Sequence, residues 1–128
     1  MTILDTHVWL WWIGDDPRLS PRAREAIEVA DEIGISTISV WELATLERLG
    51  RIRLLPDIRT WVRRALAREG VSPFPVTPDI ALAAGSLLSP FPGDPADRLV
   101  YATAVVTDAR LVSGDRRIVR HDPNRVVW

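Results

Sequence analysis

The chain has 128 residues, of which 47% are hydrophobic and 26% charged, so we expect one globular domain spanning residues 1–128. Its formal net charge of −1 provides no global basic field that would attract nucleic acid. Because there is no cysteine and there are only two histidines, disulfides, zinc–thiolate sites and cysteine nucleophiles are excluded, and a histidine-rich metal site is not expected.

The first predicted strand, Thr2–Leu4, runs into an acidic residue, Asp5, and a short helix begins at Thr6. The apolar stretch in this helix, Val8–Ile13, is far shorter than the roughly 20 residues that a membrane span needs. It also follows an acidic residue rather than a basic one, which does not fit a signal peptide. We therefore expect a cytoplasmic protein without a membrane-spanning segment.

Capping residues and glycines divide the rest of the chain into alternating helices and strands. The predicted helices are 20–32, 39–50, 57–68, 77–88 and one that begins at Asp94, and the predicted strands are 35–37, 72–76, 109–113 and 125–128. The helix from Asp94 is apolar almost all round, so it should be buried, and the prolines of strand 72–76 place that strand towards an edge. The alternation predicts an α/β fold, a three-layer α/β/α domain with a central, mostly parallel sheet of about five strands.

Four acidic residues occur where a strand gives way to a helix or just inside a helix start, namely Asp5, Glu42, Asp97 and Asp115. The carboxyl ends of parallel strands meet along one edge of an α/β sheet, so acids far apart in sequence can converge there. Clustered carboxylates repel one another unless a cation joins them, and ligand sets made only of oxygen favour Mg²⁺ or Mn²⁺. The pattern predicts an acidic metal site.

Each acid also has a structural interpretation. Glu42 follows Ser39 at the spacing of a capping box, Asp97 follows Asp94 in the same way, and Asp115 fits a turn. No nearby basic triad would build an ion-pair network around any of them. The joint occurrence of the acids at separate strand–helix junctions favours the metal site.

The aromatic residues near these acids have two interpretations as well. Trp9, Trp11, Trp12 and Trp41 could stack on nucleobases or pack in the protein interior. Because Trp9 and Trp12 share a helical face, the core or a subunit interface is favoured. For His7 we expect a structural hydrogen bond rather than a direct role in the site.

Four segments that carry the acids resemble the motifs of PIN-domain proteins, specifically VapC-type toxin ribonucleases. In chain order they are Leu4–Leu10, Ser36–Ala44, Gly93–Leu99 and Leu111–Asp115. Together they keep the family's order and spacing over the whole chain. Three small departures are Ser113 in place of the usual threonine, Tyr101 where small residues are usual, and Asp94 as an additional acid one helical turn before Asp97. Tyr101 should affect packing more than chemistry.

The resemblance implies a metal-dependent endoribonuclease, the toxin of a toxin–antitoxin pair, that hydrolyses RNA phosphodiesters with metal-activated water. Asp5 and Asp97 would hold the principal Mg²⁺, for which Mn²⁺ can substitute, and Glu42 and Asp115 would complete the catalytic, metal-binding pocket. The hydroxyls of Thr6 and Ser113 would orient the carboxylates. At the rim of the pocket, Arg98, Arg116 and Arg117 would neutralise the RNA phosphates.

The resemblance also implies a homodimer and a small cognate antitoxin. We expect an amphipathic helix of that partner to lie along the helix Val40–Leu49 and the neighbouring helix that carries Ile58, Trp61 and Val62. Two alternatives stay open, a non-catalytic PIN-fold binding module and a DNA-directed nuclease that uses the same acidic site. A receiver-type phosphoacceptor domain and a phosphate-binding loop are excluded because all 16 basic residues are arginine and both need lysine.

Overall fold

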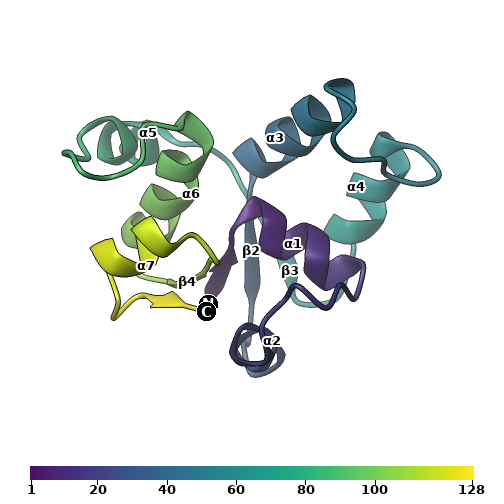
Figure 1. The fold of residues 1–128 in the computed structure, drawn as a ribbon, viewed down its shortest axis with the longest axis horizontal. Coiled ribbons are helices and arrows are strands. Elements are labelled where there is room, and N and C mark those ends of the chain that lie inside the picture. Colours follow the sequence, from purple (N-terminus) through teal and green to yellow (C-terminus); the bar gives the residue numbers. More distant parts are fainter.

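A five-stranded sheet with helices on both faces is formed by residues 1–128 in the computed structural model (Figure 1). The strands are β1 (Thr2–Leu4), β2 (Ile33–Ser36), β3 (Val71–Phe74), β4 (Arg110–Val112) and β5 (Val126–Val127). The helices are α1 (Thr6–Ile13), α2 (Pro21–Glu28), α3 (Thr37–Arg48), α4 (Ile58–Leu66), α5 (Pro78–Gly85), α6 (Pro95–Val106) and α7 (Arg116–His121). All neighbouring strands are parallel, so the predicted α/β/α fold is confirmed.

The central strands are apolar because both of their faces are covered. Alternate residues point to opposite faces, so Leu4 and Val112 pack in one core with helices α1 to α4. Ile3 and Leu111 point the other way and pack in a second core with α6 and α7. As predicted, α6 is largely buried, and Tyr101 in this helix belongs to the second core, where its hydroxyl donates to the Asp122 carboxylate at 3.0 Å.

The strand order β3-β2-β1-β4-β5 places β1 at the centre of the sheet. From β1 the chain builds outward on one side through β2 and β3, and then returns to build β4 and β5 on the other side. Such a reversal creates a crevice at the carboxyl ends of the central strands, which is where open α/β sheets bind ligands. In this chain the crevice lies beside the ends of β1 and β4, directly before Asp5 and Ser113.

Most predicted elements are present, with shifted boundaries. The segment 72–76 is the edge strand β3, which pairs only with β2, and 125–128 contains the opposite edge strand β5. The prediction was wrong for the start of α3, because Ser36 rather than Ser39 is the N-cap. The helix α7 had no predicted range. The longest helices have 12 residues, and none combines the length and apolar character of a membrane span.

Candidate active site

Asp5 is held rigidly at the end of β1. One oxygen of its carboxylate accepts a hydrogen bond from the backbone N–H of Thr6 at 2.7 Å, so Asp5 is the N-cap of α1. The other oxygen accepts from the Ser113 hydroxyl at 2.7 Å, across the gap between β1 and β4. Asp5 is only 8% exposed, so these two donors fix its orientation. The predicted orienting role of Ser113 is therefore seen, whereas the Thr6 hydroxyl instead donates to Ser39 at 2.8 Å.

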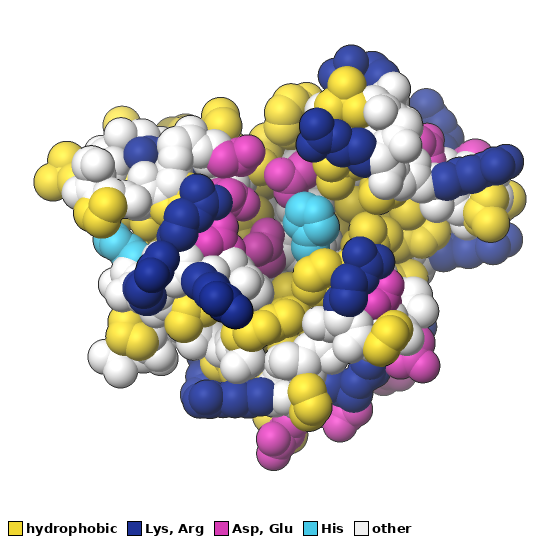
Figure 2. Space-filling view, viewed as in Figure 1, with side chains coloured by type: hydrophobic (Ala, Val, Ile, Leu, Met, Phe, Trp, Pro, Cys, Tyr) yellow, Lys and Arg dark blue, Asp and Glu magenta, His cyan; other side chains and the backbone are white.

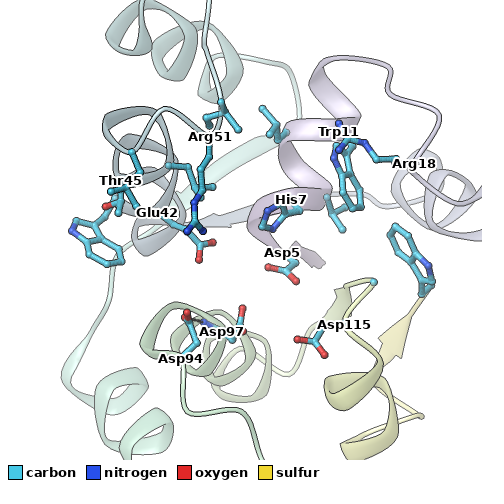
Figure 3. Close-up of a pocket in the computed structure, with 18 of the residues that line it drawn as sticks. Asp5, His7, Trp11, Arg18, Glu42, Thr45, Arg51, Asp94, Asp97 and Asp115 are labelled. Atoms are coloured by element: carbon cyan, nitrogen blue, oxygen red, sulfur yellow. Dashed lines mark hydrogen bonds between the residues drawn. The ribbon is translucent and has the colours of Figure 1, made fainter.

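Glu42 is not a capping residue, contrary to one of its two predicted interpretations. Because α3 begins at Thr37, Glu42 lies in the second turn of the helix, where no backbone N–H needs a cap. Ser39, the other half of the predicted capping box, is buried and accepts the hydrogen bond from Thr6. Glu42 faces the cleft between α3 and the start of α6 (Figure 3).

Asp94 and Asp97 both lie at the start of α6, where Asp94 caps the helix and Asp97 lines the cleft without capping it. Asp94 is the N-cap, and its Oδ1 accepts from the backbone N–H groups of Ala96 at 2.8 Å and Asp97 at 3.2 Å. The Asp97 carboxylate has no hydrogen-bond donor and no basic partner. Oxygen atoms of Glu42, Asp94 and Asp97 all lie within 4.8 Å of one another. Asp94 therefore belongs to the acidic cluster even though it also caps the helix.

Asp115 has both a capping role and a cationic partner. It is the N-cap of α7, and its carboxylate accepts from the Arg117 backbone N–H at 2.8 Å. The Arg117 guanidinium donates to the same carboxylate at 3.2 Å through Nε and at 2.9 Å through Nη2. Arg117 holds the pKa of Asp115 below its usual range, so this acid is ionised in the folded protein.

The other three predicted acids have the opposite electrostatic environment. Burial, and after it the neighbouring charges of Asp5, Asp94, Glu42 and Asp115, together raise the pKa of Asp97 to about 7. Burial also raises the pKa values of Glu42 and Asp5. Ionised together, Glu42, Asp94 and Asp97 would repel one another at short range, whereas Asp5 and Asp115 are not part of this close group. A divalent cation among them removes that repulsion, so the donor set fits a hard metal ion.

The acids line a cleft of about 790 Å³ that is hollowed between α1, α3, α6 and the β4–α7 loop. Figure 2 shows acidic side chains and a histidine in its centre and arginines around it. Sequence reasoning missed three residues in the lining, Arg18, Arg51 and Trp128. Arg18 and Arg51 lie in loops and Trp128 follows the last strand, so only the tertiary fold brings them to the site.

Of the three predicted rim arginines, only Arg117 lines the cleft. Arg98 is wrong as a phosphate-binding candidate, because its Nη1 donates to the backbone carbonyl oxygens of Ala84 at 3.2 Å and Leu87 at 2.9 Å. These bonds tie α6 to the end of α5. Arg116 is exposed on α7 outside the cleft lining.

One of the tryptophans named above lies in the protein interior and two line the cleft. Trp9 is fully buried and packs edge-on against Trp61 of α4, with ring centroids 5.2 Å apart. Trp61 is partly buried, packs against this core and does not line the cleft, so the partner surface predicted on α4 stays a prediction. Trp41 is 56% exposed and Trp11 half-buried, and both line the cleft.

His7 does not make the structural hydrogen bond that we expected from the sequence. Its side chain is exposed in the cleft, with the ring centroid 5.8 Å from that of Trp11, and it makes no hydrogen bond. Figure 3 places it next to Asp5 on the same wall. It is therefore available to solvent and to whatever enters the cleft.

Comparison with known proteins shows which family and which folds this chain resembles. Residues 2–123 match the PIN domain family. Ribonuclease VapC22 of Mycobacterium tuberculosis is 45% identical over 128 residues, which cover 98% of this chain and 97% of that protein. A toxin-antitoxin complex from Klebsiella pneumoniae superposes with a TM-score of 0.71 at 21% identity, covering 100% of this chain and 97% of that one. VapBC2 from Rickettsia felis, bound to a promoter DNA fragment, gives a TM-score of 0.68 at 16% identity over 98% and 95% of the two chains.

Proposed function

This chain belongs to the PIN domain family, as its four acidic motifs predicted, and on that premise we propose that it is a metal-dependent endoribonuclease, the toxin of a toxin–antitoxin pair. The observation that carries the proposal is the Asp97 carboxylate, which has no partner of its own and lies with Glu42 and Asp94 in one acidic cluster. Asp97 lies in the first turn of α6, where a negative charge is favourable to the helix, but no side chain of the protein neutralises it. A bound cation would neutralise it.

In this proposal Asp5 and Asp97 hold the principal Mg²⁺ or Mn²⁺, and Glu42 and Asp115 complete the site. When bound, the metal lowers the pKa of water and neutralises charge that builds up on the phosphate. The hydrogen bond from Ser113 keeps the second oxygen of Asp5 in a fixed position, so the carboxylate needs little reorganisation on binding. Glu42 is anchored in the interior of α3 and is suited to orient the attacking water.

Arginines at the cleft support the approach of RNA to an acidic site. Arg117 uses Nε and Nη2 for Asp115, which leaves Nη1 of the guanidinium for a phosphate oxygen. Arg51 and Arg18 line other parts of the cleft. These cations offset the repulsion that the carboxylates exert on phosphates flanking the cut.

The direct test is cleavage of RNA by the purified protein. We expect total RNA to be cut in Mg²⁺ or Mn²⁺ and to remain intact when EDTA is added, with no cutting by the Asp97→Ala variant. Single-stranded and double-stranded DNA of matched sequence serve as the control substrates. Cutting of DNA alone would support a DNA nuclease, inactivity on both would support a binding module, and activity in EDTA would contradict the metal mechanism.

The proposed protein partner is a small antitoxin. Two of the solved structures with this fold are described as a toxin-antitoxin complex and a VapBC complex. In this chain the α3 side of the cleft is apolar and accessible, with Trp41, Leu46, Leu49 and Ile52 in its lining. This wall suits the apolar face of an amphipathic helix. A partner bound there would also block entry to the acids.

We further propose that the toxin is a homodimer in the cytoplasm, where RNA and antitoxin are both present. Two leucines near the end of α5 support a subunit contact, since Leu82 is 69% and Leu88 80% exposed. Sedimentation equilibrium should give twice the 14.4 kDa mass of the chain. A monomer at micromolar concentration would contradict the dimer without affecting the proposed active site.

A further inference from the structure

Two tryptophans form a pair on the wall of the cleft opposite to the apolar α3 side. Trp11 extends from α1 and Trp128 follows β5, and their ring centroids are 5.9 Å apart with the planes inclined at 51°. Both side chains are half-buried and line the cleft. The core therefore supports the rings from behind while part of each stays accessible.

Trp128 packs directly against the loop that carries two residues of the acidic site. A Cβ atom added to Gly114 would lie 3.0 Å from the Trp128 ring, so the ring rests on the Gly114 backbone. Gly114 separates Ser113, which holds Asp5, from Asp115. Trp128 is thus in contact with the loop residue that directly precedes Asp115.

A guanidinium group extends the aromatic surface. The Arg18 guanidinium carbon lies 5.3 Å from the centroid of the Trp11 ring, and the Arg18 side chain is 68% exposed. Asp16 accepts from its Nε and Nη2, which fixes the guanidinium plane and leaves Nη1 free for an anion. A flat cation over one ring of an aromatic pair suits the binding of a base and its phosphate.

The two walls of the cleft differ in how their aromatic rings are arranged. On the α1–β5 wall two indole rings lie against each other, and Arg18 lies over one of them. The α3 wall has a single indole, Trp41, among the aliphatic side chains of Leu46, Leu49 and Ile52, with Arg51 in the same lining. The paired rings favour the α1–β5 wall for an unpaired nucleobase, and the aliphatic side chains favour the α3 wall for a protein helix.

We propose that Trp11, Trp128 and Arg18 form a stacking subsite for one unpaired nucleobase of the RNA, adjacent to the phosphate that is cut. This inference rests on the proposed ribonuclease function and assigns a position in the cleft to the base next to the cut. Stacking is tolerant of sequence because every base has a π face. The subsite selects unpaired RNA and does not read a particular base.

The test compares the wild type and each tryptophan variant on two substrates, an intact RNA and an RNA that lacks one base. A short single-stranded RNA that the wild type cuts is compared with versions in which one nucleotide on either side of the cut is abasic. We expect the wild type to lose roughly 5- to 100-fold in kcat/KM at one of these positions. Trp128→Leu and, separately, Trp11→Leu should cut the intact RNA with a similar loss and show no further loss on the abasic RNA. Trp128→Phe, which keeps an aromatic ring, should retain most of the wild-type preference for intact RNA over abasic RNA.

Trp12→Leu is the matched control, because Trp12 is also a half-buried tryptophan of α1 beside an arginine, Arg68, at 5.1 Å, but it does not line the cleft. It should retain the full penalty for the missing base. The proposal is overturned if the wild type is indifferent to both abasic positions, or if Trp128→Leu and Trp11→Leu keep the wild-type penalty. Unchanged cleavage by Trp128→Leu with a large loss of antitoxin affinity would also overturn it, and would assign the pair to the protein partner.

A separate experiment tests the subsite if the protein proves not to be a ribonuclease. If the wild type cuts no RNA, the stacking subsite is measured by binding of fluorescent oligouridine and its abasic analogue to Asp97→Asn, with and without Trp128→Leu. A preference for oligouridine that disappears with Trp128→Leu supports the subsite in a non-catalytic protein. Equal binding of both oligomers overturns it.

Discussion

Asp97, like Glu42, caps no helix, unlike the other three acids of the cleft. Asp5, Asp94 and Asp115 each cap a helix, so each has a reason to be present that does not involve a ligand. Asp97 caps nothing and pairs with nothing, and it still lies in the cluster with Glu42. Its raised pKa means that a bound cation would favour the ionisation of this carboxyl in the folded protein.

The raised pKa of Asp97 predicts that its ionisation destabilises the metal-free protein. In the unfolded chain this group titrates near its ordinary value of 3.8, whereas in the folded protein it titrates at about 7. Between these pH values the folded state binds more protons than the unfolded state, so this contribution to stability is lost as the pH rises. Asp97→Asn should remove about 1–2 kcal/mol of this pH dependence, since solvent at the open cleft screens part of the full effect.

The measurement is urea unfolding in EDTA at pH values from 4 to 8, for the wild type and Asp97→Asn. The difference in the free energy of unfolding should grow in favour of the variant up to about pH 7 and then level off. A difference that does not vary with pH would contradict the raised pKa.

At the residue scale, the sequence predicted the acids that follow strands better than it predicted their surroundings. Asp5 and Asp115 are placed by local signals, a buried strand followed by an acid. Glu42 had a competing capping interpretation because Ser36 and Ser39 are both plausible caps, and only the end of β2 at Ser36 decides between them. Residues such as Arg18 and Trp128 carry no local signal, so they could not be assigned to the site.

At the scale of elements, β2 illustrates how close packing of the sheet positions the site. Gly34 lies between β1 and β3, and a Cβ atom there would lie 2.5 Å from Cδ1 of Ile3 and 3.0 Å from the ring of Phe74. Because Gly34 has no side chain, the side chains of Ile3 and Phe74 can both pack over its backbone. The next residues along β2 lead to Ser36 and the start of α3, which carries Glu42.

Gly34→Ala should destabilise the protein by about 1–3 kcal/mol, because Ile3 is fully buried and can make room only by displacing its neighbours. Gly85→Ala is the control, since a Cβ atom at the end of α5 meets nothing within 4 Å. The control should be neutral or stabilising by up to about 1 kcal/mol. Chemical denaturation of both variants checks this, and equal stabilities would contradict the packing argument.

The elements themselves were largely predictable, because Pro, Gly, Ser and Thr mark the helix starts and ends locally. Thr77 and Asp94, for example, are N-caps as the sequence predicted. The short helix α7 was missed because Arg116–His121 is only six residues long and has no apolar periodicity to indicate it. Its formation depends on Ile118 packing into the second core.

At the scale of the whole molecule, the reversal of strand order beside β1 creates one cleft with two chemically different walls. The acids lie between the α3 side, where Leu46, Leu49 and Ile52 are accompanied by Trp41 and Arg51, and the α1–β5 side, which carries the Trp11–Trp128 pair and Arg18. A substrate and an inhibitory partner can therefore compete for the same acids while making contact with different residues.

Leu46→Asp should weaken antitoxin binding at least about 10-fold, because it places an unpaired charge in the apolar wall. Val29→Asp, which changes a 72% exposed residue at the end of α2 outside the cleft lining, should leave the affinity unchanged. Titration calorimetry with the cognate antitoxin measures both. An unchanged affinity in well-folded Leu46→Asp would show that the partner binds elsewhere.

Thermal unfolding in EDTA and in Mg²⁺ or Mn²⁺ tests most directly whether the acidic cluster is a metal centre. Wild type should unfold at a higher temperature with metal, because binding to the folded state alone stabilises it. Asp97→Ala should unfold in EDTA at a temperature equal to or above that of wild type, since one repelling charge is gone, and should gain little from metal. Asp94→Ala should lose about 0.5–2 kcal/mol of capping energy and keep most of the metal response. If Asp97→Ala is instead less stable than wild type in EDTA and responds to metal as wild type does, the cluster is not the metal centre.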